Sequence, residues 1–145
     1  MNVIQRLSKV NKYIRQFSVD GIRPVVVTRS GDAVTKLARL AGDQLLVARP
    51  ELSVDGDVDC MRPRVTLAFF AIAKIDGPSL TEEVENNTYD RLEVLIDKIL
   101  AQFAEDITGA ECPLLRGMDL VAVDVVPESG IFGGWSGYSI EISLE

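Results

Sequence analysis

The fold is decided by the stretch RVTLAFFAIAK, residues 64–74, which is the longest strand candidate in the chain. Both the odd-numbered and the even-numbered positions of this run are apolar, so that Leu67 and Phe69 would face one side of a strand and Phe70 and Ile72 the other. A strand of this kind is buried on both of its faces. The uncharged run from Val65 to Ala73 is far shorter than the ~20 residues that cross a bilayer. The stretch therefore predicts a strand inside a globular domain.

A long amphipathic helix follows this strand after the break at Gly77-Pro78-Ser79 and an acidic segment from Glu82 to Thr88. Asn87 is placed to cap the helix, and Asp90 in its first turn favours the positive end of the helix dipole. One stripe over four turns is apolar, and it consists of Tyr89, Leu92, Leu95, Ile96, Ile99, Leu100 and Phe103. This pattern predicts a helix of about residues 87–106.

A first amphipathic helix covers Met1 to Phe17, and Gly21 is placed to end it. Its apolar stripe is Val3, Leu7, Val10, Ile14 and Phe17, and its other faces are basic. We expect this helix to pack on the sheet. The alternative for such a helix is a position on a membrane surface.

The other elements are shorter. Four further strands are predicted at Val25–Thr28, Gln44–Arg49, Leu120–Val126 and Tyr138–Leu144, with Pro50 and Pro127 interrupting two of them. The segment Ser30-Gly31-Asp32 offers a turn and an N-cap for a short helix with Val34, Leu37, Ala38 and Ala41 on one face. Ser53 to Asp59 reads as a turn between strands.

This order of elements predicts a single α+β domain over residues 1–145. Its sheet is mixed and mainly antiparallel, and the helix of about 87–106 and the N-terminal helix pack on it. The last two strands form a hairpin across the loop Gly130-Ile131-Phe132-Gly133-Gly134.

Charge and missing residue types exclude several classes of function. The chain has 15 Lys and Arg against 22 Asp and Glu, a net charge of −7, so it repels nucleic-acid backbones. It contains no histidine, which removes the commonest general base, the His-dependent nucleophiles and most zinc sites. Cys60 and Cys112 have no CxxC partner, and we interpret both as structural thiols.

Three segments resemble ligand or catalytic motifs, and each also has a structural interpretation. Asp55, Asp57 and Asp59 have the spacing with which a calcium loop begins, but Cys60 and Thr66 occupy the positions of the required Gly and Glu. A solvated turn is the alternative. Glu82, Glu83, Glu85 and Asp90 could supply an acid and base pair, or form a solvated loop and helix start.

The third segment is the glycine-rich loop around Trp135, with Gly130, Gly133, Gly134 and Gly137. Bare backbone amides could cradle a phosphate, but a phosphate loop leads into a helix and carries a Lys, whereas this loop leads into a strand. The structural interpretation is a hairpin loop whose Trp135 packs against the sheet edge or against a neighbour. We expect no catalytic, cofactor or metal site in the chain.

From Arg64 onward, the element order resembles that of the tail-terminator, or tail-tube completion, proteins of long-tailed bacteriophages. The shared features are an apolar strand, a four-turn helix, a Gly/Pro loop and a final hairpin whose second strand opens near the Trp of Gly133-Gly134-Trp135-Ser136-Gly137. The similarity covers roughly the last 80 residues and the N-terminal helix. The extra strand and helix suggested by Val25 to Ala41 depart from the family's pattern.

This resemblance implies a structural virion protein of a phage or prophage and not an enzyme. Six copies would form a ring that caps the tail tube and joins it to the head-completion proteins, without a cofactor. Such a protein would be cytoplasmic in a bacterial host before it enters the virion tail. A ring needs a heterologous interface, for which Ile131, Phe132 and an exposed Trp135 are candidate anchors, and a net-negative ring would let DNA pass without binding it.

Two other classes of function remain open. One is a different neck, connector or adaptor module that binds other proteins. The other is an enzyme or small-ligand binder that uses carboxylates, which would need an apolar pocket with two nearby carboxylates of raised pKa.

Overall fold

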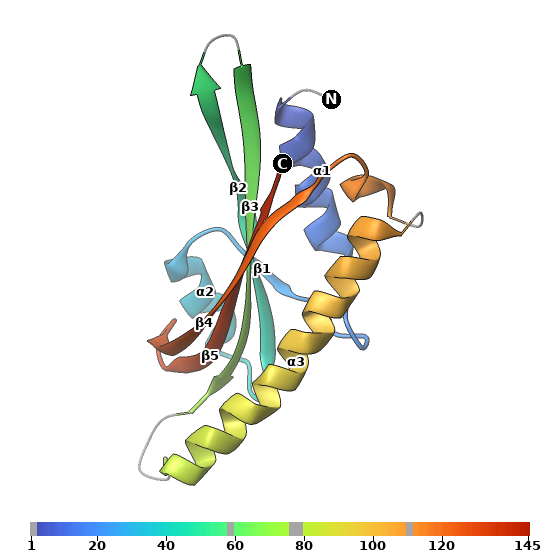
Figure 1. The fold of residues 1–145 in the computed structure, drawn as a ribbon. Helices are drawn as coiled ribbons and strands as arrows, with labels where there is room; N and C mark the ends of the chain where they lie inside the picture. Colours follow the sequence, from blue (N-terminus) through green and yellow to red (C-terminus); the bar gives the residue numbers. More distant parts are fainter. Residues whose placement is uncertain (1–2, 58–59, 76–79, 110–111) are drawn as a thin grey trace.

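A computed structural model describes residues 3–57, 60–75, 80–109 and 112–145, which form an α+β fold (Figure 1). The elements in chain order are α1 (Val3–Gln16), β1 (Val25–Val27), α2 (Ser30–Leu37), β2 (Gln44–Asp57), β3 (Cys60–Lys74), α3 (Glu82–Thr108), the short 3-10 helix η1 (Pro113–Leu115), β4 (Leu120–Ile131) and β5 (Trp135–Leu144). The strand and helix suggested between residues 25 and 41 are both present, as β1 and α2.

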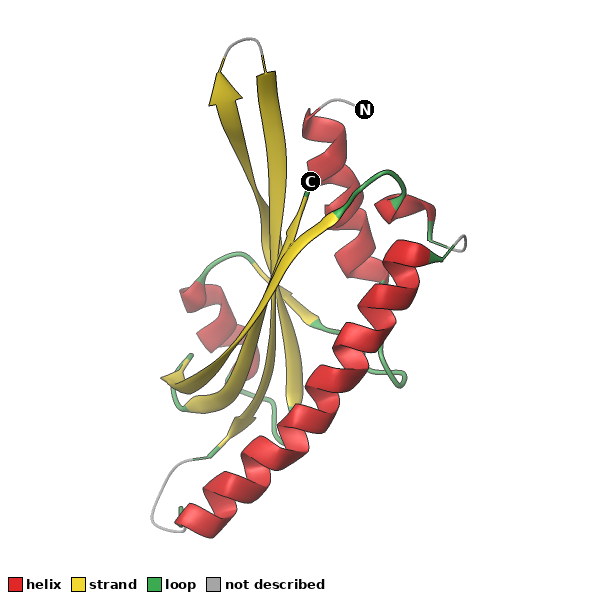
Figure 2. Ribbon diagram, viewed as in Figure 1, coloured by secondary structure: helices red, strands yellow, loops and turns green. Residues whose placement is uncertain are grey.

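The five strands form one mixed sheet in the order β1-β2-β3-β5-β4 (Figure 2). Only β1 and β2 are parallel, and the other three pairs are antiparallel. The prediction of a mixed, mainly antiparallel sheet is confirmed. The apolar strand of residues 64–74 lies in its middle as part of β3, between β2 and β5.

Helices cover both faces of the sheet. Figure 1 shows α1 and α3 on one face and α2 on the other. Leu67, Phe69 and Ala71 of β3 belong to the larger core cluster beneath α1 and α3, whereas Ile72 belongs to the smaller cluster beneath α2. Because each face of β3 packs against its own core cluster, both the odd-numbered and the even-numbered residues of the stretch are apolar.

The long helix begins earlier than its predicted N-cap, Asn87. Thr81 is the N-cap, and its side-chain oxygen accepts a hydrogen bond from the Val84 N–H at 3.2 Å. Glu82, Glu83 and Glu85 therefore form the first turn of α3 and not a loop, and this is the helix end that the dipole makes favourable for carboxylates.

The predicted end of the second strand at Pro50 is also wrong. β2 continues to Asp57 because Pro50 falls where the register shifts between Ala48 and Glu51, a bulge at which its missing N–H costs no ladder hydrogen bond. The predicted turn over residues 53–57 is a strand, and Val58 and Asp59 lie outside the described residues.

The far halves of β2 and β3 form a two-stranded ribbon, residues 51–57 and 60–64, which we call the arm. β1 pairs with β2 only as far as Ala48, and β5 pairs with β3 only from Val65 onward. The arm therefore projects beyond the rest of the sheet (Figure 1).

Two local predictions near the N-terminus need correction. Helix α1 ends at Gln16, and Gly21 is not its stop but part of a tight turn with Asp20. Both residues have positive φ, 51° and 75°, within the bridge Val19↔Ile22. The buried face of α2 is Ala33 and Leu37, and Val34 of the predicted face is exposed.

Candidate assembly surface

The edge strand β4 exposes an unusual number of large aliphatic side chains. Leu120, Val121, Val123, Val125 and Val126 are 37–48% exposed. The strand is long and has no partner on its outer edge among the described residues. Proteins usually protect such an edge with basic residues, proline or bulges. β4 has Pro127 and bulges near its two ends, which leaves the segment from Ala122 to Val126 with one charge, Asp124.

The position of α3 explains why β4 is exposed. Val123 and Val125 pair with Ile142 and Ile140 of β5, so they point to the face of the sheet that carries α3. The helix packs over β5 and β3. It buries the two isoleucines and leaves their neighbours on β4 beyond its reach.

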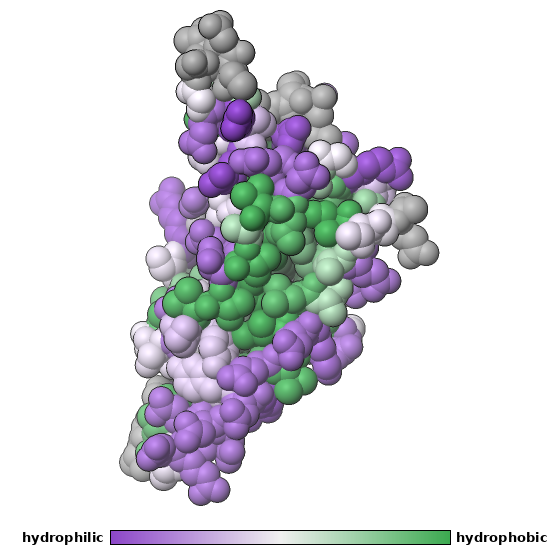
Figure 3. Space-filling view, in the orientation of Figure 1, coloured by the Kyte–Doolittle hydropathy of each residue, from purple (hydrophilic) through white to green (hydrophobic). Residues whose placement is uncertain are grey.

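A groove results between β4 and the second half of α3. It has a volume of about 500 Å³ and an apolar lining that includes Leu100, Phe103, Ile107, Met118 and Val123, with Asp119 as its one carboxylate. Figure 3 shows apolar surface in the middle of this face of the molecule. The groove opens directly onto the exposed strand, and we call the two together the β4 surface.

Hydrogen bonds hold the first half of α3 against the sheet. Tyr89 donates its hydroxyl to the Glu128 carbonyl at 2.6 Å, and Tyr138 donates to Glu93 Oε1 at 2.8 Å. Burial, and then the hydrogen bond to Glu93, raises the pKa of Tyr138 to about 12. The phenol therefore stays neutral and keeps donating throughout the physiological range.

The opposite end of α3 is held by Tyr13 of α1. Its hydroxyl donates to Asp106 Oδ2 at 2.6 Å, and Gln102 donates to the other oxygen of the same carboxylate at 2.9 Å. Burial, followed by the bond to Asp106, raises the Tyr13 pKa above its ordinary value. Backbone hydrogen bonds between Asp119 and Glu145 fix the start of β4. The groove is thus already formed in the single chain.

The predicted anchor Trp135 is not exposed. Its side chain is 2% exposed and lies in the smaller core cluster with Leu37, Leu46 and Ile72. Ile131 and Phe132 are half-buried against the same cluster. The expectation of an exposed Trp135 is wrong because α2 and the sheet enclose the indole. The interpretation in which it packs on the sheet is confirmed.

The glycine-rich loop is a hairpin loop. The Gly134 N–H donates to the Ile131 carbonyl at 3.1 Å, and the chain runs from β4 into β5 and not into a helix. Phe132 has φ 50° and its ring packs on Phe70. Gly137 has φ +155°, and a side chain there would meet the Ala71 carbonyl oxygen at 2.1 Å. Close packing therefore requires glycine at position 137, whereas Gly130, Gly133 and Gly134 supply the positive φ angles of the turn.

The remaining candidate residues do not converge on one site. Glu82, Glu83, Glu85 and Asp90 are exposed along α3, and Asp55 is exposed on the arm. Asp59 of the possible calcium loop lies outside the described residues. Within the described ranges, no group of three or more Cys, Asp or Glu side chains is placed to hold a metal ion. Cys112 is a free, half-buried thiol that packs against the larger core cluster.

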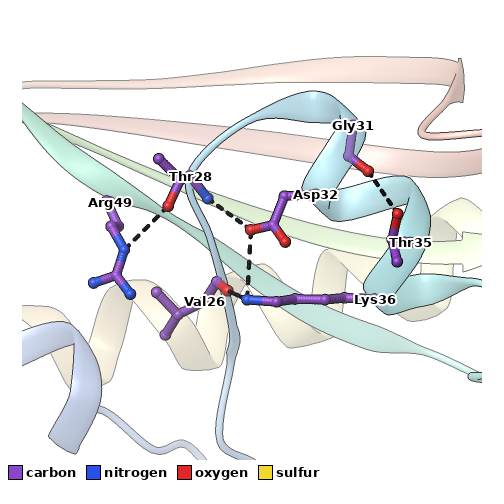
Figure 4. A network of polar contacts seen from close by, with 7 residues as sticks. All are labelled: Val26, Thr28, Gly31, Asp32, Thr35, Lys36 and Arg49. Carbon is purple, nitrogen blue, oxygen red and sulfur yellow. Dashed lines mark hydrogen bonds and ion pairs between the residues drawn. The ribbon is translucent and has the colours of Figure 1, made fainter.

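A polar network at the start of α2 is structural (Figure 4). Asp32 accepts a hydrogen bond from the Thr28 N–H at 3.1 Å, and this bond lowers its pKa. Lys36 lies 3.4 Å from the same carboxylate and donates to the Val26 carbonyl at 2.7 Å, while Arg49 donates to the Thr28 hydroxyl at 3.1 Å. The bond from Lys36 to Val26 ties α2 to β1, and the bonds to Thr28 tie the segment between them to α2 and to β2.

Sequence reasoning missed the β4 surface, although a signal was present. The segment from Leu120 to Val126 has apolar residues at both odd-numbered and even-numbered positions, as residues 64–74 do. In β3 this pattern marks burial on two faces, whereas in β4 it marks a strand that the chain itself leaves uncovered.

Comparisons with known proteins do not assign the chain to a family. No protein-family model matches the sequence, and a search of curated proteins gave no match. None of the helices in the described part of the chain is long and apolar enough to span a membrane.

Proposed function

We propose that this protein is an architectural subunit that assembles with other copies of itself through the β4 surface. The observation that carries this proposal is the uncovered edge strand β4, whose exposed Leu120, Val123 and Val125 lie on the α3 side of the sheet, where Leu120 and Val123 line an apolar groove. A long apolar edge leaves unpaired backbone groups and apolar area in water, and a second polypeptide covers both at once.

The distribution of charge favours a second copy as the occupant. Residues 1–49 contain nine Lys and Arg and three Asp, whereas residues 50–145 contain six Lys and Arg and nineteen Asp and Glu. Two identical chains can therefore attract each other in an orientation that joins the basic part of one to the acidic part of the next. A contact between two different surfaces is heterologous, and it produces a ring when the rotation closes.

A closed ring is the form that the resemblance to phage tail-terminator proteins implies. In this proposal a ring of six copies caps a tail tube and joins it to head-completion proteins. The extra elements β1 and α2 do not conflict with it, because β1 forms the edge of the sheet opposite β4 and α2 lies on the face opposite α3. A different neck or adaptor protein would use the same surface.

The carboxylate-based enzyme receives no comparable support. The lining of the apolar groove contains one carboxylate, Asp119, and the two carboxylates that line a hollow at the start of α3, Glu82 and Glu83, are exposed and lie in a polar setting. An acid and base pair needs two.

The test is the mass of the purified protein in solution, measured by light scattering and sedimentation velocity over a range of concentrations. The wild-type chain should form a discrete oligomer, and negative-stain electron microscopy should show rings. Val123→Asp should weaken self-association by at least about a hundredfold, because it places a charge in the centre of a desolvated contact.

Folding should survive this substitution, since Val123 is more than one-third exposed in the single chain. Val94→Asp is the matched control. Val94 lies on α3 and is more exposed than Val123, but it does not line the groove with β4. A wild-type protein that stays monomeric at high concentration would refute the proposal.

A further inference from the structure

We infer that the part of the neighbouring copy that occupies the β4 surface is the apolar face of the arm together with the first turn of α1. The copies then join head to tail. This inference rests on the proposed function and names the second half of the contact.

The arm has one apolar face and one polar face. Leu52 packs against the larger core cluster. Because side chains alternate along a strand, Val54 shares the face of Leu52, and its pairing partner Pro63 shares it too. Met61 lies two residues from Pro63 on the same face and is 65% exposed. The other face carries Ser53, Asp55, Arg62 and Arg64.

A ribbon of this kind is poorly stabilised on its own. Both edges of the arm lack strand partners among the described residues, and a two-stranded hairpin without a covering layer is marginal in water. An apolar face on such a ribbon is explained when another molecule covers it.

The first turn of α1 extends this apolar face. Figure 1 shows that α1 begins at the end of the molecule from which the arm projects. Ile4, in that turn, is 67% exposed. Ile4, Val54 and Met61 are thus exposed large apolar residues on the two elements at this end of the molecule, on other elements than the group on β4.

The two apolar groups lie beside opposite charges. α1 carries four cations and no carboxylate, and none of these cations forms an ion pair with a described residue. α3 carries eight carboxylates and two cations, Arg91 and Lys98, which already pair with Asp43 and Asp20. Seating the arm of one copy on the β4 surface of the next thus brings α1 towards an acidic helix.

The same charges oppose a symmetric contact through β4. A two-fold contact between two β4 strands would place two acidic α3 helices beside each other, and such like-charge contacts are unfavourable. The sheet order separates β4, at one edge, from β2 and β3 of the arm. One chain therefore has both halves of a head-to-tail contact at different places.

The test uses two variants, each of which blocks one half. Met61→Asp blocks the arm and leaves the β4 surface intact, and Val123→Asp does the reverse. Each variant alone should be monomeric by sedimentation velocity, with an association at least a hundredfold weaker than that of wild type. An equal mixture should form a dimer of twice the chain mass and nothing larger, because it contains one intact contact.

The outcomes separate the inference from the proposed function. If Val123→Asp is monomeric but Met61→Asp assembles like wild type, the arm is not the counterpart, and self-assembly through β4 still holds. If the mixture of two monomeric variants forms no dimer, the two surfaces do not meet and the inference fails. If Val123→Asp itself assembles normally, the proposed function fails.

Thermal unfolding followed by circular dichroism confirms that both variants are folded, and Leu40→Asp, on an exposed site outside both surfaces, is the control.

Discussion

Trp135 fixes the loop between β4 and β5 against the face of the sheet that carries α2. Its indole packs in the cluster that also contains Leu37 and Ile72. The neighbouring Ser136 hydroxyl accepts a hydrogen bond from the Gly130 N–H at 3.0 Å across the loop. The residue is thus part of the core of the single chain.

Trp135→Ala is therefore expected to affect folding and not assembly. Removing a buried indole leaves a cavity and costs about 3–5 kcal/mol of unfolding free energy. Chemical denaturation should show this loss, while the oligomer mass of the remaining folded protein stays that of wild type. A variant with unchanged stability but a smaller oligomer would place Trp135 at a subunit contact.

Sequence patterns determined which residues are apolar but not which of them are buried. The indole of Trp135 and the side chains of Val123 and Val125 are all apolar. Trp135 is enclosed because α2 lies over it, and the valines are exposed because α3 packs over β5 and β3 and does not cover them. The positions of the helices over the sheet decide this difference.

At the scale of elements, the arm projects beyond the rest of the sheet and, in the inference above, serves assembly and not the stability of the single chain. The helices and the rest of the sheet pack without it, since the pairings of β3 with β5 begin at Val65. The sequence predicted a turn after Ser53, because Gly56 and several Asp residues are typical of turns. The pairing of Ser53 with Arg64 and of Asp55 with Arg62 across the ribbon extends the strands instead.

Replacing residues 53–64 by an Asn-Gly turn should leave the fold intact and abolish self-association. The shortened hairpin would close between Leu52 and Val65, which already face each other, and Asn-Gly favours a two-residue turn. Circular dichroism should show a melting temperature close to that of wild type, and light scattering should give the mass of a monomer. Oligomers of unchanged size from this variant would exclude the arm from the contact.

For helix α3, the sequence predicted the element but not the residue at which it begins. Its apolar stripe located the helix correctly, but its start was predicted several residues late. Thr81 caps it, and the acidic residues that resemble a loop are stabilised by the helix dipole. Local chemistry of this kind shifts the ends of elements without changing their order.

For the whole molecule, the proposed attraction between copies depends less on the net charge of −7 than on the separation of basic residues from acidic residues along the chain. A uniform charge of this sign would make copies repel one another. In the proposed assembly, the basic first 49 residues and the acidic remainder would make the attraction between two copies depend on their orientation.

Salt should therefore weaken assembly. Raising the ionic strength from about 0.05 M to about 0.5 M shortens the range of electrostatic attraction to well below 10 Å. We expect the dissociation constant of the copies to rise by about tenfold, with the remaining affinity coming from apolar contact. Sedimentation velocity at several salt concentrations measures this slope. Association that strengthens with salt would show that like charges face each other across the contact.

The sequence by itself determined the class of the fold, the central strand, the two long helices and the absence of histidine chemistry, because each depends on the spacing or identity of residues within one segment. Only the tertiary structure decided that Trp135 is buried, that β4 is left uncovered and that the arm projects. Those properties depend on where a helix crosses a sheet and on which strand lacks a neighbour, and both are set by contacts between segments far apart in the chain.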